Sequence, residues 1–359
     1  MDMIIYGAQG YALGAYNAIK KLQPEKNVRC FAVTSMGSNA SHLCALPVKE
    51  IAAVSEEFSA EEKKSTEVLI ATPANVHAEI EATLDKLGFS CHKRLTSELW
   101  NVMMRELYHA TGEFRPLADL PAGDLVPSVD IYMAKSHVDK PLTETFELPL
   151  YMKPVQVGAA NTDERIAEIR DDEGDSISKK NGNYCELTGL YWVWKNALTG
   201  DLCKAEYCGF AQYRRILMLS EEDLSRLAAN DVDVLLPYPL LYEPDINAHH
   251  QRYIKDADWT ALLKAIRELQ PQYADAVHEI LAQKYMFNYN VILAKRKVLD
   301  DYCSWLFPIL ERTEELSDPK ECDRSDRYIG YMGETLETLY FLKNRDKLKI
   351  THAGCRLLV

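Results

Sequence analysis

The sequence predicts an α/β protein built from two domains. Three observations lead to this fold class. The 359 residues suffice for two hydrophobic cores, strand and helix patterns alternate through residues 1–112, and a segment rich in proline and glycine precedes a new apolar strand. We therefore expect a first domain at 1–112, a linker at 113–128 and a second domain at 129–359.

The first domain is expected to be a Rossmann-like parallel sheet covered by helices. Met3–Tyr6, Val28–Thr34 and Val68–Thr72 are apolar runs of strand length. Ala12–Leu22 and Val76–Leu87 have the apolar spacing of helices. Because alternation with short connections is typical of parallel sheets, these strands are expected to run side by side in one direction.

The second domain also mixes strands with helices. Strands are expected at Val129–Ala134, Arg165–Ile169, Glu206–Ala211, Val232–Leu236 and Tyr289–Ala294, and helices near 257–269, 272–284, 297–314 and 326–343. The linker before this domain contains three prolines and a glycine, which interrupt regular structure.

The composition limits the classes of function. With 41 basic and 54 acidic residues the net charge is −13, which argues against broad nucleic-acid binding. The nine cysteines contain no CxxC pair and are expected to be reduced thiols of a cytoplasmic protein. No signal-peptide pattern or membrane-length apolar run is present, so we expect a cytoplasmic protein, with peripheral contact at the inner face of the cell membrane and homo-oligomer formation left open.

Gly7, Gly10 and Gly14 form a candidate ligand loop between the first strand and the first helix. Glycine at such a place allows the backbone to approach a pyrophosphate. However, the GxxGxxxG spacing departs from GxGxxG, and no Asp or Glu follows the second strand to bind a ribose hydroxyl. A structural, oligomerising or small-ligand role is therefore favoured over NAD(P) catalysis.

Basic and amide side chains gather in the sequence between residues 179 and 215. Lys179, Lys180 and Asn181 open a predicted helix, and Arg214 and Arg215 follow a predicted strand. Phosphate binds at helix N-termini and beside guanidinium groups, and positive charge at a helix start is unfavourable unless an anion is near. We therefore expect a sugar-nucleotide site here; simple surface lysines are the alternative for the helix start.

Asp171, Asp172 and Asp175 form an acidic loop just before this helix. A carboxylate at this place is suited to accept hydrogen bonds from a uracil ring or a ribose. A solvated acidic turn is the equal alternative.

Several short blocks between residues 129 and 345 occur in an order shared with a known family. They are Tyr132–His137, Pro154–Ala159, Gly174–Asn181, Tyr184–Asn196, Gln212–Arg215, Met286–Asn288 and Arg327–Glu334. In these blocks the chain resembles bacterial capsular and exopolysaccharide glycosyltransferases, catalogued as domain of unknown function 4422. The family commonly has His where Gln212 stands, and Arg-Leu where Thr335 and Leu336 stand.

The resemblance implies a GT-A-like fold for the second domain and a nucleotide-activated sugar as donor. A UDP-sugar is expected, and galactofuranose transfer is one activity associated with similar proteins. The resemblance also places His137, Gln212, Tyr213 and Asn288 among the substrate-binding candidates.

The resemblance directs attention to the end of the Glu206–Ala211 strand. A GT-A enzyme commonly has Asp-x-Asp there for a divalent metal, whereas this chain has Gln212-Tyr213-Arg214-Arg215. We expect the two arginines to neutralise the departing diphosphate in place of a metal, which is possible but not favoured. Neighbouring strand residues point to opposite faces, so both arginines reach one ligand only if the chain turns here. The alternative is one internal ion pair and one surface arginine.

Glu334 is the predicted general base. Inverting sugar transfer needs a carboxylate that deprotonates the acceptor hydroxyl, and Glu334 matches the glutamate of the resembling family. The alternative is a helix N-terminal Glu favoured by the helix dipole. Asp323 and Asp326 are reserve candidates.

The leading hypothesis is a glycosyltransferase that moves a sugar from a nucleotide-diphosphate donor to a capsule, exopolysaccharide or O-antigen glycan, with a lipid-linked acceptor. Two alternatives stay open: an NAD(P)-dependent sugar-nucleotide oxidoreductase, and a non-catalytic sugar-nucleotide-binding protein.

Overall fold

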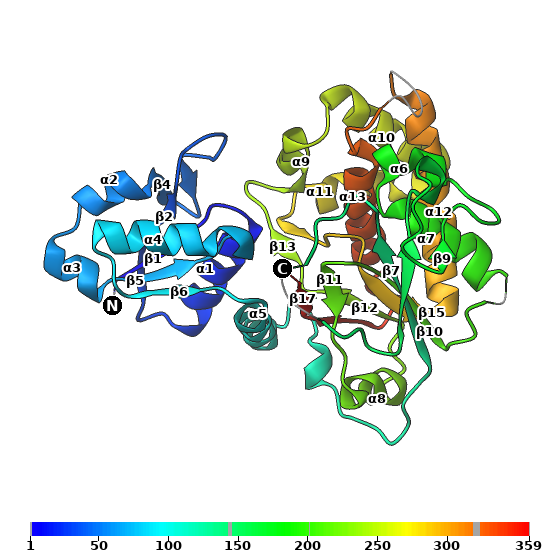
Figure 1. Cartoon of the computed structure of the whole chain (residues 1–359), viewed down its shortest axis with the longest axis horizontal. Helices are drawn as coiled ribbons and strands as arrows, with labels where there is room; N and C mark the ends of the chain where they lie inside the picture. Colours follow the sequence, from blue (N-terminus) through cyan, green and yellow to red (C-terminus); the bar gives the residue numbers. More distant parts are fainter. Residues whose placement is uncertain (1, 143–145, 201, 319–323, 359) are drawn as a thin grey trace. The chain divides into compact units, whose positions relative to one another are not determined.

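The computed structural model describes residues 2–142, 146–200, 202–318 and 324–358 (Figure 1). The chain divides into two compact units. Unit 1 contains residues 2–114 with 240–243, and unit 2 contains residues 115–239 with 244–358. No helix within the described ranges is both long enough and apolar enough to cross a membrane.

Unit 1 is a mostly parallel sheet flanked by helices. Its strands are β1 (Asp2–Tyr6), β2 (Asn27–Val33), β3 (His42–Leu43), β4 (Leu46–Glu50), β5 (Glu67–Ile70), β6 (His92–Arg94) and β13 (Leu240–Leu241). Its helices are α1 (Gly10–Leu22), α2 (Ile51–Glu56), α3 (Ala60–Ser65), α4 (His77–Leu87) and α5 (Ser97–Thr111). The sheet order is β3-β4-β2-β1-β5-β6, and the strands from β4 to β6 are parallel. The predicted strands and helices of this unit are confirmed to within a few residues at their ends.

The candidate glycines of unit 1 lie where backbones or helices approach closely. Gly7 has φ +135°, and a Cβ there would lie 2.5 Å from the carbonyl oxygen of Ala71. A Cβ on Gly14 would lie 2.2 Å from the ring of Trp100, so this glycine lets α1 pack against α5. A Cβ on Gly10 would lie 3.0 Å from the Cβ of Leu240. Packing within unit 1 therefore accounts for these glycines; their predicted role in binding a ligand stays a prediction.

Unit 2 has a larger mixed sheet. The strands of unit 2 are β7 (Val129–Lys135), β8 (Met152–Gln156), β9 (Ile169–Arg170), β10 (Tyr207–Gln212), β11 (Arg215–Leu217), β12 (Val234–Pro237), β14 (Tyr285–Met286), β15 (Ile292–Lys295), β16 (Ile350–Ala353) and β17 (Cys355–Leu357), and all of them except β14 belong to this sheet. The main order is β16-β12-β15-β10-β7-β8-β9, with β11 joined to β10 and β17. β10, β7, β8 and β9 are parallel, and β15 is antiparallel to both β10 and β12.

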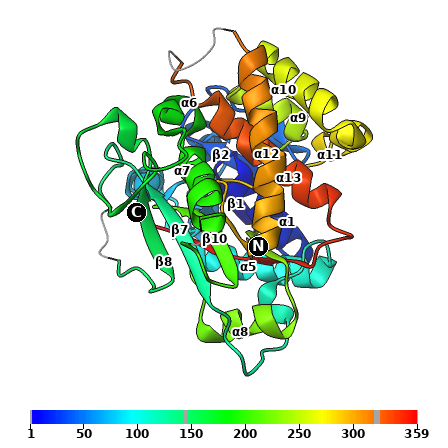
Figure 2. The same ribbon diagram turned by 90° about the vertical axis from the view of Figure 1, so that its right-hand side faces the viewer.

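Helices pack on the sheet of unit 2. They are α6 (Asn181–Tyr184), α7 (Leu187–Trp192), which continues as a π-helix at Val193–Leu198, α8 (Glu221–Ala229), α9 (Ile246–His249), α10 (Asp256–Leu269), α11 (Ala274–Leu281), α12 (Arg296–Leu316) and α13 (Tyr328–Lys343). Figure 2 shows α7 and α12 over one face of the sheet. Gly189 allows α7 to pack closely on β10, because a Cβ at this position would lie 3.2 Å from the ring of Phe210.

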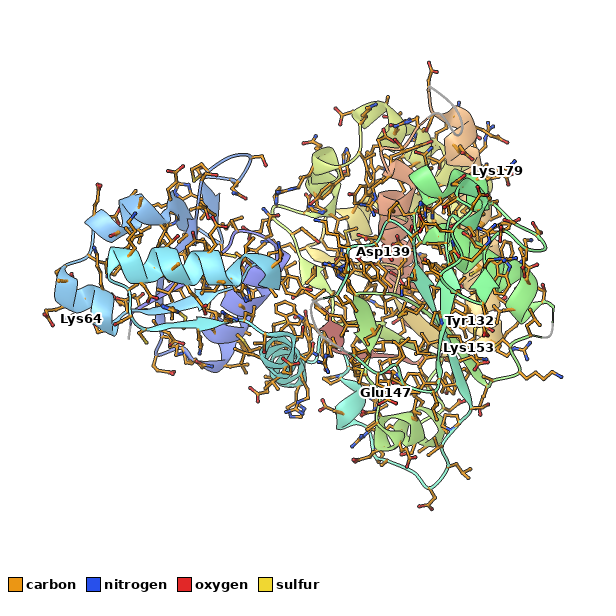
Figure 3. The ribbon with its side chains drawn as sticks, viewed as in Figure 1. Lys64, Tyr132, Asp139, Glu147, Lys153 and Lys179 are labelled. Carbon is orange, nitrogen blue, oxygen red and sulfur yellow. The ribbon has the colours of Figure 1, made fainter. Side chains whose placement is uncertain are left out.

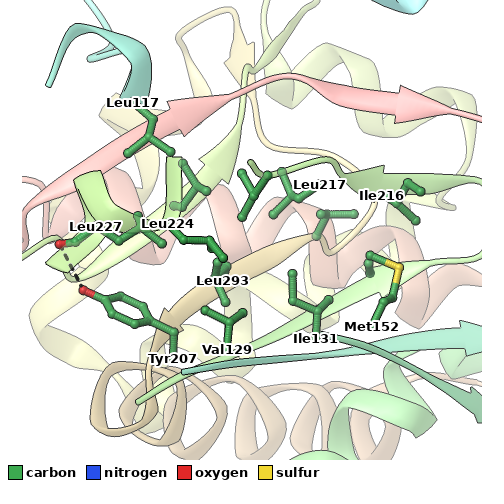
Figure 4. Packing of buried hydrophobic residues seen from close by; sticks show 14 of the residues in the cluster. Leu117, Val129, Ile131, Met152, Tyr207, Ile216, Leu217, Leu224, Leu227 and Leu293 are labelled. Carbon is green, nitrogen blue, oxygen red and sulfur yellow. Dashed lines mark hydrogen bonds between the residues drawn. The ribbon is translucent and has the colours of Figure 1, made fainter. Parts of the chain in front are cut away.

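The opposite face of the sheet carries the core in Figure 4. Alternate residues of β7, Val129, Ile131 and Met133, are buried there against Leu217 and Leu293. Successive side chains of a strand point to opposite faces, so every second residue of β7 reaches this core. The segment predicted as a linker contributes to the same core through Leu117 and Leu120, which are 2% and 3% exposed.

The strand order of unit 2 creates a switch point between β7 and β10. β8 and β9 follow on one side of β7, whereas β10 lies on its other side. In open α/β sheets, ligands bind beyond the carboxyl ends of the strands at such a point. Because β15 is antiparallel to β10, the residues just before it, 288–290, reach this same edge. Segments distant in sequence thus meet at the carboxyl ends of β7 and β10.

Candidate active site

The two arginines lie at a tight hairpin turn at the end of β10. Gln212 of β10 pairs with Arg215 of β11, so Tyr213 and Arg214 form the turn between them. The condition that the chain must turn here is therefore met. Arg214 Nη2 donates to the carbonyl of Lys140 (3.2 Å), and both arginines are half-buried.

Arg215 stacks on an aromatic ring. Its guanidinium carbon lies 3.6 Å from the ring centroid of Tyr289, and its Nη1 donates to Gln212 Oε1 (3.4 Å). A cation over the face of an aromatic ring is stabilised electrostatically. The stacking fixes the guanidinium plane at the sheet edge.

Gln212 and Asn290 together hold Glu186, which the sequence analysis did not single out. Gln212 Nε2 donates to Glu186 Oε1 (2.7 Å) and to the carbonyl of Tyr289 (2.9 Å). Asn290 Nδ2 donates to the same Glu186 oxygen (2.9 Å). Tyr289 and Asn290 have φ of 76° and 52°. Such left-handed backbone is costly for non-glycine residues and is concentrated at functional sites.

Glu334 lies in the second turn of α13, half-buried, at this same edge. Asn288 Nδ2 donates to Glu334 Oε2 (2.9 Å), and the backbone N–H of Tyr289 donates to the same carboxylate. Burial, followed by the charge of Glu186, raises the pKa of Glu334 to about 7. The positive charge of Arg215 acts in the opposite direction and lowers the pKa of Glu334. A carboxylate with a pKa near neutrality is suited to accept and release a proton at cellular pH.

Glu337, one turn after Glu334, is a second carboxylate that the sequence analysis missed. It is 1% exposed, and neither oxygen has a hydrogen-bond partner within the described part of the chain. Burial, followed by the charges of Glu334 and Glu186, raises its pKa well above the usual range. In the sequence Glu337 lies within an apolar helix, and this pattern does not indicate a buried carboxylate.

Asp171 is a fully buried carboxylate that organises the loops after β8 and β9. Its two oxygens accept hydrogen bonds from the backbone N–H groups of Gly158 (2.9 Å) and Ala159 (3.1 Å), and from the hydroxyls of Ser178 (2.5 Å) and Thr188 (2.6 Å). The chain itself thus uses both oxygens. The structure gives Asp171 a positioning role and excludes the solvated turn, since the side chain is buried; its predicted contact with a ligand stays a prediction.

We predict that Asp171→Ala destabilises the protein strongly. Four buried donors lose their acceptor, which is expected to cost roughly 3–5 kcal/mol. Urea unfolding followed by circular dichroism measures the change. Asp175→Ala is the matched control, because Asp175 is exposed and accepts one bond from the Tyr191 hydroxyl (3.0 Å). Equal unfolding midpoints for the two variants would contradict the positioning role.

The other polar candidates of residues 172–181 make contacts of their own. Asp172 lies 3.3 Å from Arg170 Nε in an ion pair. Lys180 Nζ donates to Glu314 Oε2 (2.5 Å). Asn181 Nδ2 donates to the carbonyl of Cys185 (2.7 Å), whereas Lys179 is exposed at the surface. Their predicted contact with a ligand stays a prediction.

His137 follows β7, at the switch-point edge. Its Nδ1 is buried and has no hydrogen-bond partner among the residues described. Nearby Asp139 accepts a bond from the backbone N–H of Ser136 (2.7 Å). Burial raises the pKa of Asp139 and the charge of Arg214 opposes this, which places Arg214 beside the His137 loop. Figure 3 shows Asp139 and Lys179 well apart, so the β7 edge and the start of α6 are separate places.

The two reserve carboxylates are Asp323 and Asp326. Asp323 lies outside the described residues. Asp326 accepts from Arg324 Nη2 (2.6 Å), and Arg324 also pairs with buried Asp258 (2.7 Å). In the described ranges, no three His, Cys, Asp or Glu side chains gather at a spacing that holds a metal ion.

Comparisons with known proteins bear on this site. Residues 133–345 match a family described as domain of unknown function (DUF4422). The chain belongs to this family. The match runs from β7 to α13 and includes every candidate from His137 to Glu334, whereas the glycines of unit 1 lie outside it. The sequence-based resemblance to this DUF4422 family is therefore confirmed.

The DUF4422 chain resembles the solved structure of a glycosyltransferase. It is similar to the apo structure of the bifunctional glycosyltransferase WbbM, at 27% identity and a TM-score of 0.55. The similarity covers 64% of this chain and 45% of that one, so this chain spans less than half the length of the solved protein. No curated protein matches. The predicted mixed α/β fold is confirmed as glycosyltransferase-like; the names Rossmann-like and GT-A-like stay predictions.

Proposed function

We propose that this protein is a glycosyltransferase that uses a nucleotide-diphosphate sugar, with a UDP-sugar as the expected donor. The observation that carries the proposal is Glu334: a half-buried carboxylate with a pKa of about 7, beside Arg215, at the sheet edge where α/β proteins bind ligands. Similarity to a bifunctional glycosyltransferase supports the same reaction class.

In the proposed reaction, Glu334 removes the proton from an acceptor hydroxyl. The hydroxyl oxygen forms a bond to the anomeric carbon of the donor sugar, and the bond from that carbon to the diphosphate oxygen breaks. The electron pair leaves with the nucleoside diphosphate, and Glu334 keeps the proton until solvent takes it. The nucleophile must enter opposite the leaving group, so the sugar is transferred with inversion.

Arg214 and Arg215 are proposed to hold the diphosphate. Negative charge grows on the leaving group as the bond breaks, and fixed cations at that place lower the barrier. Arginine stays protonated and presents a planar fork of donors that suits phosphate oxygens. The hairpin turn supports this role because it brings consecutive arginines to one edge.

Asn288 and Gln212 are proposed to position the catalytic groups. Asn288 orients the Glu334 carboxylate, and Gln212 holds both Glu186 and the backbone of Tyr289. His137, with its buried Nδ1 at the end of β7, is proposed to face the donor nucleotide.

An NAD(P)-dependent oxidoreductase is less well supported. The second strand of unit 1 ends at Val33, and the following Thr34 hydroxyl is bonded to the Tyr6 hydroxyl (2.9 Å). No acidic residue stands directly after this strand, where a ribose hydroxyl would need one.

Thermal unfolding with a panel of UDP, GDP, CDP and NAD, with and without Mn²⁺, tests the proposal. A ligand at 100 times its dissociation constant adds about 2.7 kcal/mol of stability. For a chain of this size we expect UDP to raise the Tm by about 4 °C. A shift with NAD alone would contradict the proposal, and a UDP shift that requires Mn²⁺ would contradict the role of the arginines.

The acceptor is proposed to be a capsule, exopolysaccharide or O-antigen glycan, carried on a lipid at the inner face of the cell membrane. A cytoplasmic location and a homo-oligomeric state belong to the same proposal.

A further inference from the structure

Two tyrosines form a stacked pair one helical turn from Glu334. The ring centroids of Tyr253 and Tyr331 lie 4.7 Å apart with an interplanar angle of 23°. Tyr331 and Glu334 are three residues apart on α13, so they lie on the same side of the helix. Burial raises the pKa of Tyr331, and the charge of Glu334 adds a smaller effect in the same direction.

The outer member of this pair is open to solvent. Tyr253 is 44% exposed, which is unusual for a large aromatic side chain already stacked on another ring. The segment before Tyr253 is anchored, since His250 is buried and stacks on Trp259 with the two ring centroids 4.0 Å apart. The exposed ring is therefore held in place by its neighbours on both sides.

Polar groups surround the aromatic pair. The His249 ring lies 5.5 Å from Tyr253 in an edge-on arrangement, and the guanidinium carbon of Arg252 lies 5.8 Å from the same ring. Burial lowers the pKa of His249 to about 4, so it is neutral at cellular pH. Exposed Arg327 lies four residues before Tyr331, with its Nε donating to Cys185 Sγ (3.3 Å).

We infer that Tyr253, backed by Tyr331, binds the acceptor sugar that receives the transferred sugar. This inference rests on the proposed function. A pyranose has a face of C–H groups and a rim of hydroxyls, so it is recognised by an aromatic face bordered by hydrogen-bonding groups. The exposed ring of Tyr253, backed by Tyr331, offers the stacking surface; His249, Arg252 and Arg327 offer the border. In this proposal the reacting hydroxyl of the stacked sugar faces Glu334, which lies one helical turn from Tyr331 on α13.

The position of the pair favours the acceptor over the donor. The proposed diphosphate groups, Arg214 and Arg215, lie at the β10–β11 turn, whereas the tyrosines belong to α13 and to the segment before α10. In an inverting transfer the acceptor hydroxyl approaches the anomeric carbon from the side opposite the leaving group. The general base lies next to that hydroxyl. The two substrates thereby take different elements around Glu334.

Saturation-transfer NMR on the full-length chain tests the inference without requiring turnover. The probes are the methyl β-glycosides of glucose, galactose and N-acetylglucosamine. We expect ring C–H signals with at least one probe for the wild type, retained within about twofold in Tyr253→Phe, which keeps the ring. Tyr253→Leu and Tyr253→Gln both remove the ring and are expected to lower these signals at least about fivefold. Because Tyr253 is exposed, the Tm of each variant should stay close to that of the wild type.

The outcomes separate the inference from the proposed function. Equal signals in the wild type and both ring-less variants, or no signal with any glycoside, would overturn the acceptor subsite. The UDP-induced Tm shift should be unchanged in Tyr253→Leu. If glycosides bind through Tyr253 but UDP gives no shift even to the wild type, the donor proposal fails while the sugar subsite stands.

Discussion

Glu334→Gln is expected to lower kcat for sugar transfer by about 10²–10⁴-fold, the usual contribution of general-base catalysis. The amide keeps the size of the side chain and a hydrogen bond with Asn288, but it cannot accept the acceptor's proton. Donor binding does not use this proton, so the UDP-induced Tm shift should persist. Steady-state release of UDP from UDP-sugars in the presence of glycoside acceptors measures the change.

Asp326→Asn is the matched control for this substitution. Asp326 is the reserve carboxylate, is 40% exposed at its side chain and pairs with Arg324. Its replacement should leave kcat within about threefold, since it removes a partly exposed ion pair. A large loss of kcat in Asp326→Asn together with normal kcat in Glu334→Gln would transfer the role of base to the other carboxylate.

Arg215→Gln should reduce kcat by about 10²–10³-fold, the loss seen when one charge-stabilising group is removed from an active site. Arg215→Lys should lie between this variant and the wild type, because lysine keeps the charge but lacks the planar fork. The charge of Arg215 also opposes the raised pKa of Glu334, so the Gln variant should need a higher pH for half-maximal rate. Rates measured over a range of pH give both effects.

Arg312→Gln serves as the control for loss of a positive charge. Arg312 lies on α12 in partly exposed ion pairs with Glu268 and Glu315. Normal rates are expected there, since surface ion pairs contribute little. If both arginine variants keep full activity, the diphosphate is neutralised by other groups and the role assigned to the hairpin is wrong.

The regular elements were predictable where apolar runs are long. β1, β2 and β7 are strands of five to seven residues that each contain at least four buried positions in a row, and their expected bounds differ from the observed ones by at most one residue. β9, β11 and β17 contain two or three residues, too few to show a period of two. The helix expected to carry Lys179 through Trp192 is instead a 3₁₀ turn followed by α6 and α7, because Cys185 adopts a φ of 53° between them.

The candidate site was predictable only in part. Arg214, Arg215 and Glu334 stood out because their residue types suit phosphate and proton transfer. Glu186 did not, because its partner Asn290 is 104 residues away and only the antiparallel placement of β15 brings the two together. Asp171 resembled a solvated acid for a similar reason: its donors come from the preceding loop, after β8, and from α7.

The pH dependence of kcat tests the catalytic role of Glu334 most directly. A general base must be ionised, and the pKa of Glu334 is raised from 4.5 to about 7. We expect kcat of the wild type to fall about tenfold per pH unit below pH 7 and to level off above it. The residual kcat of Glu334→Gln should not show this fall below pH 7. A wild-type profile that is flat between pH 5 and about 8, or the same acid limb in the Gln variant, would contradict the assignment of Glu334 as the base.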